Sequence, residues 1–126
     1  MTIFSKTINF VSSKLVSLFC SNRYGYRFIS SLLDNLLKHT TPVSRNEFNI
    51  RITTPNSLCK YRADSFFEKE PATLLWLDSI PENSILWDVG ANIGLYSVYA
   101  ALRSSAIVYS FEPSVFNLEQ LARNIF

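Results

Sequence analysis

The chain has 126 residues, of which 48% are hydrophobic and 17% charged. This composition excludes an intrinsically disordered protein and predicts one domain at most, with a modest core. The net charge of +2 is unevenly spread, because residues 1–62 carry nine Lys or Arg against two acids, whereas residues 63–126 carry three against eight. The cations of the first half stand singly, so we interpret them as a solvated surface and predict no nucleic-acid partner.

Cysteine and histidine are scarce in this chain. Cys20 and Cys59 are the only cysteines and His39 is the only histidine, and none of them has the spacing of a metal site. We therefore predict no metal centre. Two widely separated cysteines indicate reduced thiols in a cytoplasmic protein, although they could in principle form one disulfide.

Residues 3–19 predict a first amphipathic helix. Lys6 and Lys14 interrupt its apolar run, which excludes a membrane-spanning segment. Lys14 also divides the apolar region that a signal peptide would need, and no small-x-small cleavage site follows. We favour a helix that packs on the domain, and the alternative is attachment of residues 3–19 to a membrane surface. The apolar stripe consists of Ile3, Phe4, Ile8, Val11, Leu15, Leu18 and Phe19.

A second amphipathic helix is predicted over residues 27–38, ending at Thr40-Thr41-Pro42. From Glu47 the apolar period changes to two, which predicts a strand, and residues 58–62 would return as its hairpin partner. We therefore divide the chain into a helical segment over residues 1–45 and a larger domain that begins with this hairpin at residue 46. Pro71 marks the first turn of a lead-in helix within residues 64–80.

The next segment predicts a buried strand, a glycine turn and a helix. Residues 85–89 form an apolar run with Asp88 near its end, as expected of a central parallel strand covered on both faces. Gly90 and Gly94 allow a sharp turn and let a ligand lie close to the backbone. Helical spacing begins at Ile93, so a ligand over the turn would meet helix N–H groups and the Asp88 carboxylate.

A second strand follows over residues 106–111, with Glu112 at its tip. An acid at this position accepts hydrogen bonds from ribose hydroxyls in nucleotide-binding sheets, and Pro113 favours the extended backbone that presents it. A helix over residues 115–125 completes a βαβα order. This order predicts an α/β fold that opens a doubly wound parallel sheet.

The spacing of the turn indicates which nucleotide is bound. A dinucleotide fingerprint requires G-x-G-x-x-G, whereas this turn reads D-x-G-x-x-x-G with Asn92 in place of the middle glycine. A side chain there disfavours a pyrophosphate. The segments FFEKEPATLLWLDSI, WDVGANIGLYSVYAA and VYSFEPSVFNLEQLARNI together resemble the FkbM family of class I S-adenosylmethionine-dependent methyltransferases over residues 64–126.

This resemblance implies a Rossmann-like methyltransferase fold and S-adenosyl-L-methionine as the cofactor. Asp88 is expected to face the methionine ammonium or to cap a helix, and Asn92 to contact the amino-acid end of the cofactor or to cap. Glu70 and Thr73 match family positions near the cofactor, with helix capping as the alternative. The expected cofactor-binding residues are Asp88, Gly90, Asn92, Gly94, Glu112, Glu70 and Thr73.

We expect O-methyl transfer to a small molecule or a sugar. Methyl transfer from a sulfonium is chiefly a matter of alignment in a water-poor site, and no residue here is identified as a catalytic base. Members of the resembled family continue beyond the second helix, so we interpret the fold as incomplete and the chain as an N-terminal fragment. The alternatives are an NAD(P)-binding oxidoreductase and a non-enzymatic truncated relic, and no oligomeric state is predicted.

The fragment interpretation has a physical consequence. Two strands alone leave the sheet faces and one sheet edge without neighbours, and an open apolar edge promotes association. We therefore predict that residues 1–126 by themselves are poorly soluble, bind the cofactor weakly or not at all and are inactive.

Overall fold

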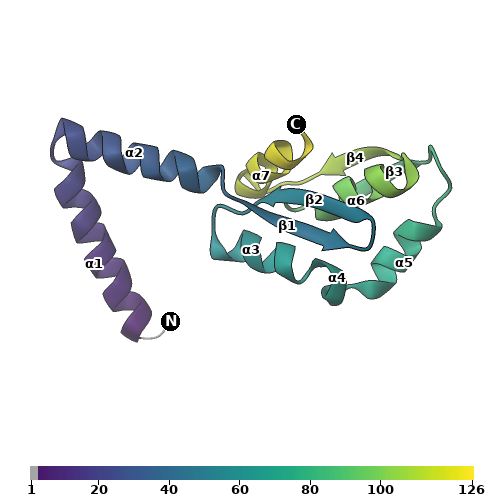
Figure 1. The fold of residues 1–126 in the computed structure, drawn as a ribbon, viewed down its shortest axis with the longest axis horizontal. Helices are drawn as coiled ribbons and strands as arrows, with labels where there is room; N and C mark the ends of the chain where they lie inside the picture. Colours follow the sequence, from purple (N-terminus) through teal and green to yellow (C-terminus); the bar gives the residue numbers. More distant parts are fainter. Residues whose placement is uncertain (1–2) are drawn as a thin grey trace. The chain divides into compact units, whose positions relative to one another are not determined.

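The computed structural model describes residues 3–126. The chain divides into two units, Met1–Leu37 and Lys38–Phe126. The described residues form a mixed α/β structure of seven helices and two two-stranded sheets (Figure 1). The domain boundary that we expected after residue 45 lies earlier, at residues 37 and 38, because residues 40–45 form a strand of the second unit.

The first unit consists of helices α1 (Ile3–Cys20) and α2 (Arg23–Leu37), which confirms both predicted helices. The two helices approach closely at Gly25, where an added Cβ would lie 1.9 Å from the Phe19 carbonyl oxygen. The rings of Phe19 and Phe28 meet at 6.0 Å between centroids. No residue of α2 is buried. Among residues 3–126, no helix has both the length and the apolar character that crossing a membrane requires.

The second unit begins with an antiparallel hairpin of β1 (Thr40–Arg45) and β2 (Phe48–Thr53). We predicted residues 58–62 as the hairpin partner of the strand that follows Glu47. This prediction was wrong, because these residues belong to helix α3 (Ser57–Asp64). The side chain of Asn56 caps α3, since its Oδ1 accepts a hydrogen bond from the Cys59 amide at 2.9 Å. Pro42 is compatible with β1 because a two-stranded sheet has only edge strands.

The remaining elements follow the predicted order closely. Helices α4 (Phe66–Lys69) and α5 (Pro71–Ser79) lead to β3 (Ile85–Val89), and Pro71 occupies the start of α5 as expected. Helix α6 (Leu95–Ser104) connects β3 to the parallel strand β4 (Ile107–Phe111), and α7 (Val115–Ile125) comes last. The helix after the glycine turn begins two residues later than the apolar spacing indicated.

The core lies among the hairpin and helices α3 to α6. Phe66 is only 3% exposed, and its ring contacts those of Phe67, Tyr96 and Tyr99 at 4.9, 5.2 and 5.6 Å. Helix α7 is tied to this core by Asn124, which accepts a hydrogen bond from the Thr53 amide at 2.8 Å and donates to the Ile93 carbonyl at 2.7 Å. Other buried core residues are Val43, Phe48, Ile52, Cys59, Ala63, Leu74, Leu77, Ile93, Leu95 and Ala100.

The β3–β4 sheet differs from the expectation of strands covered on both faces. Leu86 and Val108 pack against the core, but the alternate side chains are exposed. Trp87 and Val89, for example, are 68% and 77% exposed. Within the described chain, no element covers this face. We call it the bare face, and it consists of Ile85, Trp87, Val89, Ile107, Tyr109 and Phe111.

Candidate functional site at the carboxyl edge of the parallel strands

The two parallel strands end side by side. Val89 is in register with Phe111, so the glycine turn after β3 and Glu112 after β4 leave the sheet at the same edge. The amides of Gly90 and Ala91 both donate to the Phe111 carbonyl, at 2.8 and 3.0 Å. The turn is thereby fixed to the end of the neighbouring strand.

The two glycines of the turn have different surroundings. Gly90 and Gly94 have φ angles of +87° and +85°, a conformation that glycine adopts without strain. A Cβ on Gly90 would meet no atom within 4 Å, whereas a Cβ on Gly94 would lie 2.5 Å from Leu121 Cδ1. Gly90 therefore leaves open space for a ligand beside the backbone, while Gly94 allows α7 to pack closely.

Asn92 also adopts the left-handed conformation, with φ +56°, which asparagine tolerates better than most residues. It does not cap α6, because Gly94 occupies the N-cap position. Its Oδ1 is buried and has no hydrogen-bond partner among the described residues. An unpaired buried acceptor is costly, so this atom is suited to accept a hydrogen bond from a ligand.

Glu112 is held across the turn from Gly90. Its Oε2 accepts a hydrogen bond from the Asn92 amide at 2.8 Å, and its Oε1 accepts one from the Ser114 amide at 2.8 Å. The bond from Ser114 is the main cause that lowers the pKa of Glu112 below the ordinary value of 4.5, helped by Asn92, Asn117 and the charge of Arg62 and opposed by desolvation. Glu112 is therefore ionised at neutral pH.

Asp88 joins the strands to α6. Its Oδ2 accepts a hydrogen bond from Ser97 Oγ at 2.5 Å, and Ser97 Oγ lies 2.8 Å from Ser110 Oγ on β4. The carboxylate thus bonds the Ser97 hydroxyl in the first turn of α6, not the backbone amides at the start of the helix. It also lines a cavity beside the turn.

Two cavities lie beside Gly90, with volumes of about 230 and 300 Å³. Glu70, Gly90 and Tyr96 line both of them. Asn92 belongs to the smaller cavity, and Asp88 and Thr73 belong to the larger one. The structure therefore places Glu70 and Thr73 beside Gly90 and Asp88, whereas Gly94 and Glu112 line neither cavity.

Glu70 lies at the N-cap of α5, but its side chain makes no hydrogen bond to the backbone of the helix. Its Oε2 instead accepts a hydrogen bond from Thr73 Oγ1 at 3.2 Å. Burial, followed by the charge and hydrogen bonding of Glu70 and the charge of Asp88, raises the pKa of Tyr96 to about 12. Tyr96 is therefore a neutral hydroxyl between two carboxylates.

Comparisons with models of protein families, with curated proteins and with solved structures gave no match. The ground for a functional assignment is therefore the geometry of this edge and its sequence motif. Within residues 3–126, no group of three or more His, Cys, Asp or Glu side chains is arranged to hold a metal ion.

Three residues at the edge were not predicted as site residues. These residues are Tyr96, Arg62 and Lys69. Arg62 comes from α3 and Lys69 from α4, and both line the smaller cavity. Arg62 Nη1 also donates to Asn117 Oδ1 at 3.4 Å. No spacing in the sequence relates these cations to the glycine turn, because the fold of α3 and α4 brings them there.

Proposed function

We propose that the chain is the cofactor-binding part of an S-adenosylmethionine-dependent methyltransferase of the kind that the FkbM family represents. Its parallel strands would belong to a Rossmann-like sheet, and the methyl group would go to an oxygen of a small molecule or a sugar. The observation that supports this most is the Glu112 carboxylate, which lies across the turn from Gly90 and is anchored to the Asn92 amide at 2.8 Å.

Glu112 has the acceptor capacity that ribose recognition needs. A carboxylate offers about four lone-pair sites, and the hydrogen bonds from Asn92, Ser114 and Asn117 occupy three of them. The remaining site on Oε2 would accept a ribose hydroxyl, and ionisation of the group strengthens such a bond. A neutral glutamine would lose this advantage.

The residues around Gly90 fit the amino-acid end of the same cofactor. The unpaired Asn92 Oδ1 and the Asp88 carboxylate would accept hydrogen bonds from an ammonium group, and the open space at Gly90 would let the cofactor approach the backbone. S-adenosylmethionine supplies an electrophilic methyl group on a sulfonium. Apolar side chains line the two cavities beside Gly90, namely Phe66, Tyr96 and Leu77. They would help to exclude water from the reacting methyl group.

Asn92 argues against the nicotinamide alternative. Its side chain stands where the dinucleotide fingerprint has a glycine that lets a pyrophosphate approach the backbone. No observation in the structure favours a dinucleotide. Fluorescence titration of Trp76 and Trp87 with NADH and with S-adenosylhomocysteine separates the two cofactors, and tight NADH binding without a response to the homocysteine compound would reverse the assignment.

The direct test is retention of isotope-labelled S-adenosylmethionine by the 126-residue chain. We expect weak binding that Glu112→Gln reduces about tenfold or more, because a charge-assisted hydrogen bond to a ribose hydroxyl is lost. Glu119→Gln is the matched control, since Glu119 pairs with Arg123 on the exposed side of α7. Equal retention by the wild type and Glu112→Gln would contradict the proposed role of Glu112.

A further inference from the structure

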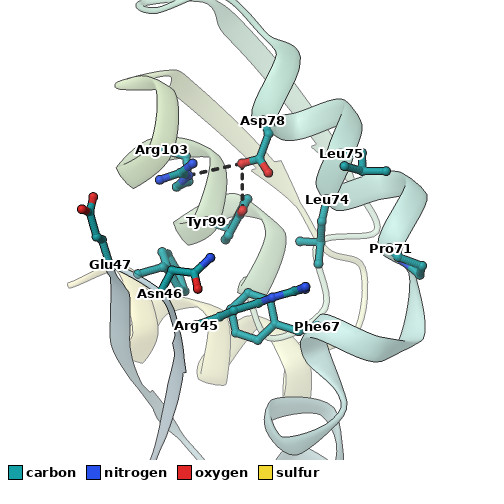
Figure 2. A pocket seen from close by; sticks show the side chains of 11 residues that line it. Arg45, Asn46, Glu47, Phe67, Pro71, Leu74, Leu75, Asp78, Tyr99 and Arg103 are labelled. Carbon is teal, nitrogen blue, oxygen red and sulfur yellow. Dashed lines mark hydrogen bonds and ion pairs between the residues drawn. The ribbon is translucent and has the colours of Figure 1, made fainter.

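A third cavity lies away from the glycine turn, between the hairpin and helices α5 and α6 (Figure 2). Its volume is about 590 Å³, and it shares no lining residue with the two cavities beside Gly90. This volume lies within the range of small-molecule sites, roughly 300–1,000 Å³. Its walls come from the hairpin turn, α4, α5 and α6, so the folded unit builds it.

Aromatic rings form much of the cavity wall. Phe48, Phe67 and Tyr99 all line it, and the ring of Phe48 lies 4.8 Å from that of Tyr99 and 5.9 Å from that of Phe67. Phe48 and Tyr99 are 7% and 6% exposed, so they are fixed by the core. They form the floor of the cavity, and the half-buried Phe67 leaves more of its ring accessible to a ligand.

Two guanidinium groups stand at this aromatic surface. The Arg45 guanidinium lies 5.6 Å from the centre of the Phe67 ring, and no carboxylate of the described residues is within 4.0 Å of it. Arg103 contacts Asp78, with Nε donating to Oδ1 at 3.2 Å. A guanidinium over a ring keeps its N–H edge free to bind the oxygens of a carboxylate or a phosphate.

The acids of the cavity do not neutralise Arg45. Asp78 Oδ1 accepts hydrogen bonds from both Arg103 and Tyr99 Oη, the second at 2.8 Å. Glu47 lies at the hairpin turn, and among the described residues it forms no ion pair within 4.0 Å with Arg45. Arg45 is therefore the cation that is left for a ligand, while Arg103, which is paired with Asp78, lines the same cavity.

We propose that this cavity binds a small molecule in which an oxyanion, either a carboxylate or a phosphate, is attached to an apolar ring. The oxyanion pairs with Arg45 and Arg103, and the ring packs against Phe67 and Tyr99. This binding site is independent of the methyltransferase assignment, because it uses none of the residues around Gly90.

The first experiment compares four probes with the 126-residue chain: phenyl phosphate, benzoate and benzyl alcohol by ligand-observed saturation-transfer NMR, and inorganic phosphate, which has no carbon-bound protons, by its competition with phenyl phosphate. We expect phenyl phosphate and benzoate to bind, and inorganic phosphate and benzyl alcohol to bind about tenfold more weakly or worse, because each lacks one of the two recognised groups. The stronger of the first two identifies the oxyanion. Equal binding of benzyl alcohol or of inorganic phosphate would overturn the proposal.

The second experiment uses charge variants with the better probe. Arg45→Gln and Arg103→Gln should each weaken binding about tenfold, and Glu47→Gln should strengthen it a few-fold by removing a like charge. Arg123→Gln is the control, because Arg123 pairs with Glu119 on α7 and lines none of the cavities. Unchanged binding in Arg45→Gln would overturn the proposal, and so would the opposite signs, with Arg45→Gln tighter and Glu47→Gln weaker. Within residues 3–126, Arg45 makes no ion pair whose loss would unfold the chain, so this variant is decisive even if Arg103→Gln is unstable.

Discussion

The two faces of the β3–β4 sheet differ sharply, and the exposed face is the more apolar of the two. On one face, Leu86 and Val108 pack against the core, and Asp88 bonds Ser97 of α6. On the bare face, residues of the same strands, such as Trp87 and Val89, are mostly exposed. The difference teaches that an apolar run predicts burial only where another element supplies the opposing surface. The polar edge of the sheet needs only the two strands and the turn, and it is formed.

The strongest test of this comparison truncates one aromatic side chain in the core and one on the bare face. Phe66→Ala removes a ring at the centre of the core and should lower the free energy of unfolding by about 3–5 kcal/mol. Trp87→Ala removes a ring of the bare face that is 68% exposed and should cost below about 1 kcal/mol. Urea unfolding followed by circular dichroism measures both.

A loss of about 3–5 kcal/mol can approach the whole free energy of unfolding of a small domain. Phe66→Leu serves as a milder variant if Phe66→Ala does not fold. Comparable losses for Phe66→Ala and Trp87→Ala would show that the bare face is covered in solution.

Alanine variants of the two glycines in the turn should show the next largest difference in free energy of unfolding. Gly94→Ala places a Cβ 2.5 Å from Leu121 Cδ1 in a backbone with φ +85°, so it should cost about 2–4 kcal/mol through strain and overpacking. Gly90→Ala meets no atom within 4 Å and should cost only the strain, about 1–2 kcal/mol. Thermal or urea unfolding compares the two.

For cofactor binding we expect the opposite order: Gly90→Ala should have the larger effect and Gly94→Ala the smaller one. Gly90→Ala should weaken binding of S-adenosylmethionine more than its stability loss explains, because Gly90 lines both cavities at the turn. Gly94→Ala, measured on the folded fraction, should bind like the wild type. Unimpaired retention in Gly90→Ala would argue against a ligand at this turn.

The bare face should govern association more than stability. Val89→Lys adds a charge on an exposed strand position and should change the free energy of unfolding by about 0.5 kcal/mol or less, while it raises solubility by opposing contact between apolar faces. Asn49→Lys adds the same charge on the hairpin and is the control. Sedimentation velocity measures association, and equal behaviour of the two variants would exclude the bare face as the associating surface.

The smallest expected effect is the pH dependence of the stability that Glu112 contributes. Its pKa is lowered in the folded chain, so its carboxylate stabilises the fold above the ordinary value of 4.5, and this contribution is lost as the pH falls through the lowered pKa. The difference in unfolding midpoint between the wild type and Glu112→Gln should therefore shrink from neutral pH to about pH 3. A difference that is constant with pH would show that the hydrogen bonds to Asn92 and Ser114 do not depend on the charge.

Much of the site could be predicted from the sequence because its signals are local. The apolar run before Gly90, the glycines and the acid before Pro113 specify strand, turn and strand end within a few residues. Two parallel strands that end at one edge then bring Asp88, Gly90 and Glu112 together. The same local reasoning also found the start of α5 at Pro71 and both N-terminal helices.

Only the tertiary structure decided the features that depend on distant segments. The hairpin pairs residues 40–45 with β2, whereas the local pattern favoured residues 58–62, whose helix is stabilised by the Asn56 cap. Gly94 was expected to face a ligand, but its small size serves the packing of Leu121 from α7. Arg62 and the Arg45 cavity likewise depend on contacts between segments far apart in sequence. Such contacts leave no period or spacing along the chain, because they are selected by packing of the whole unit.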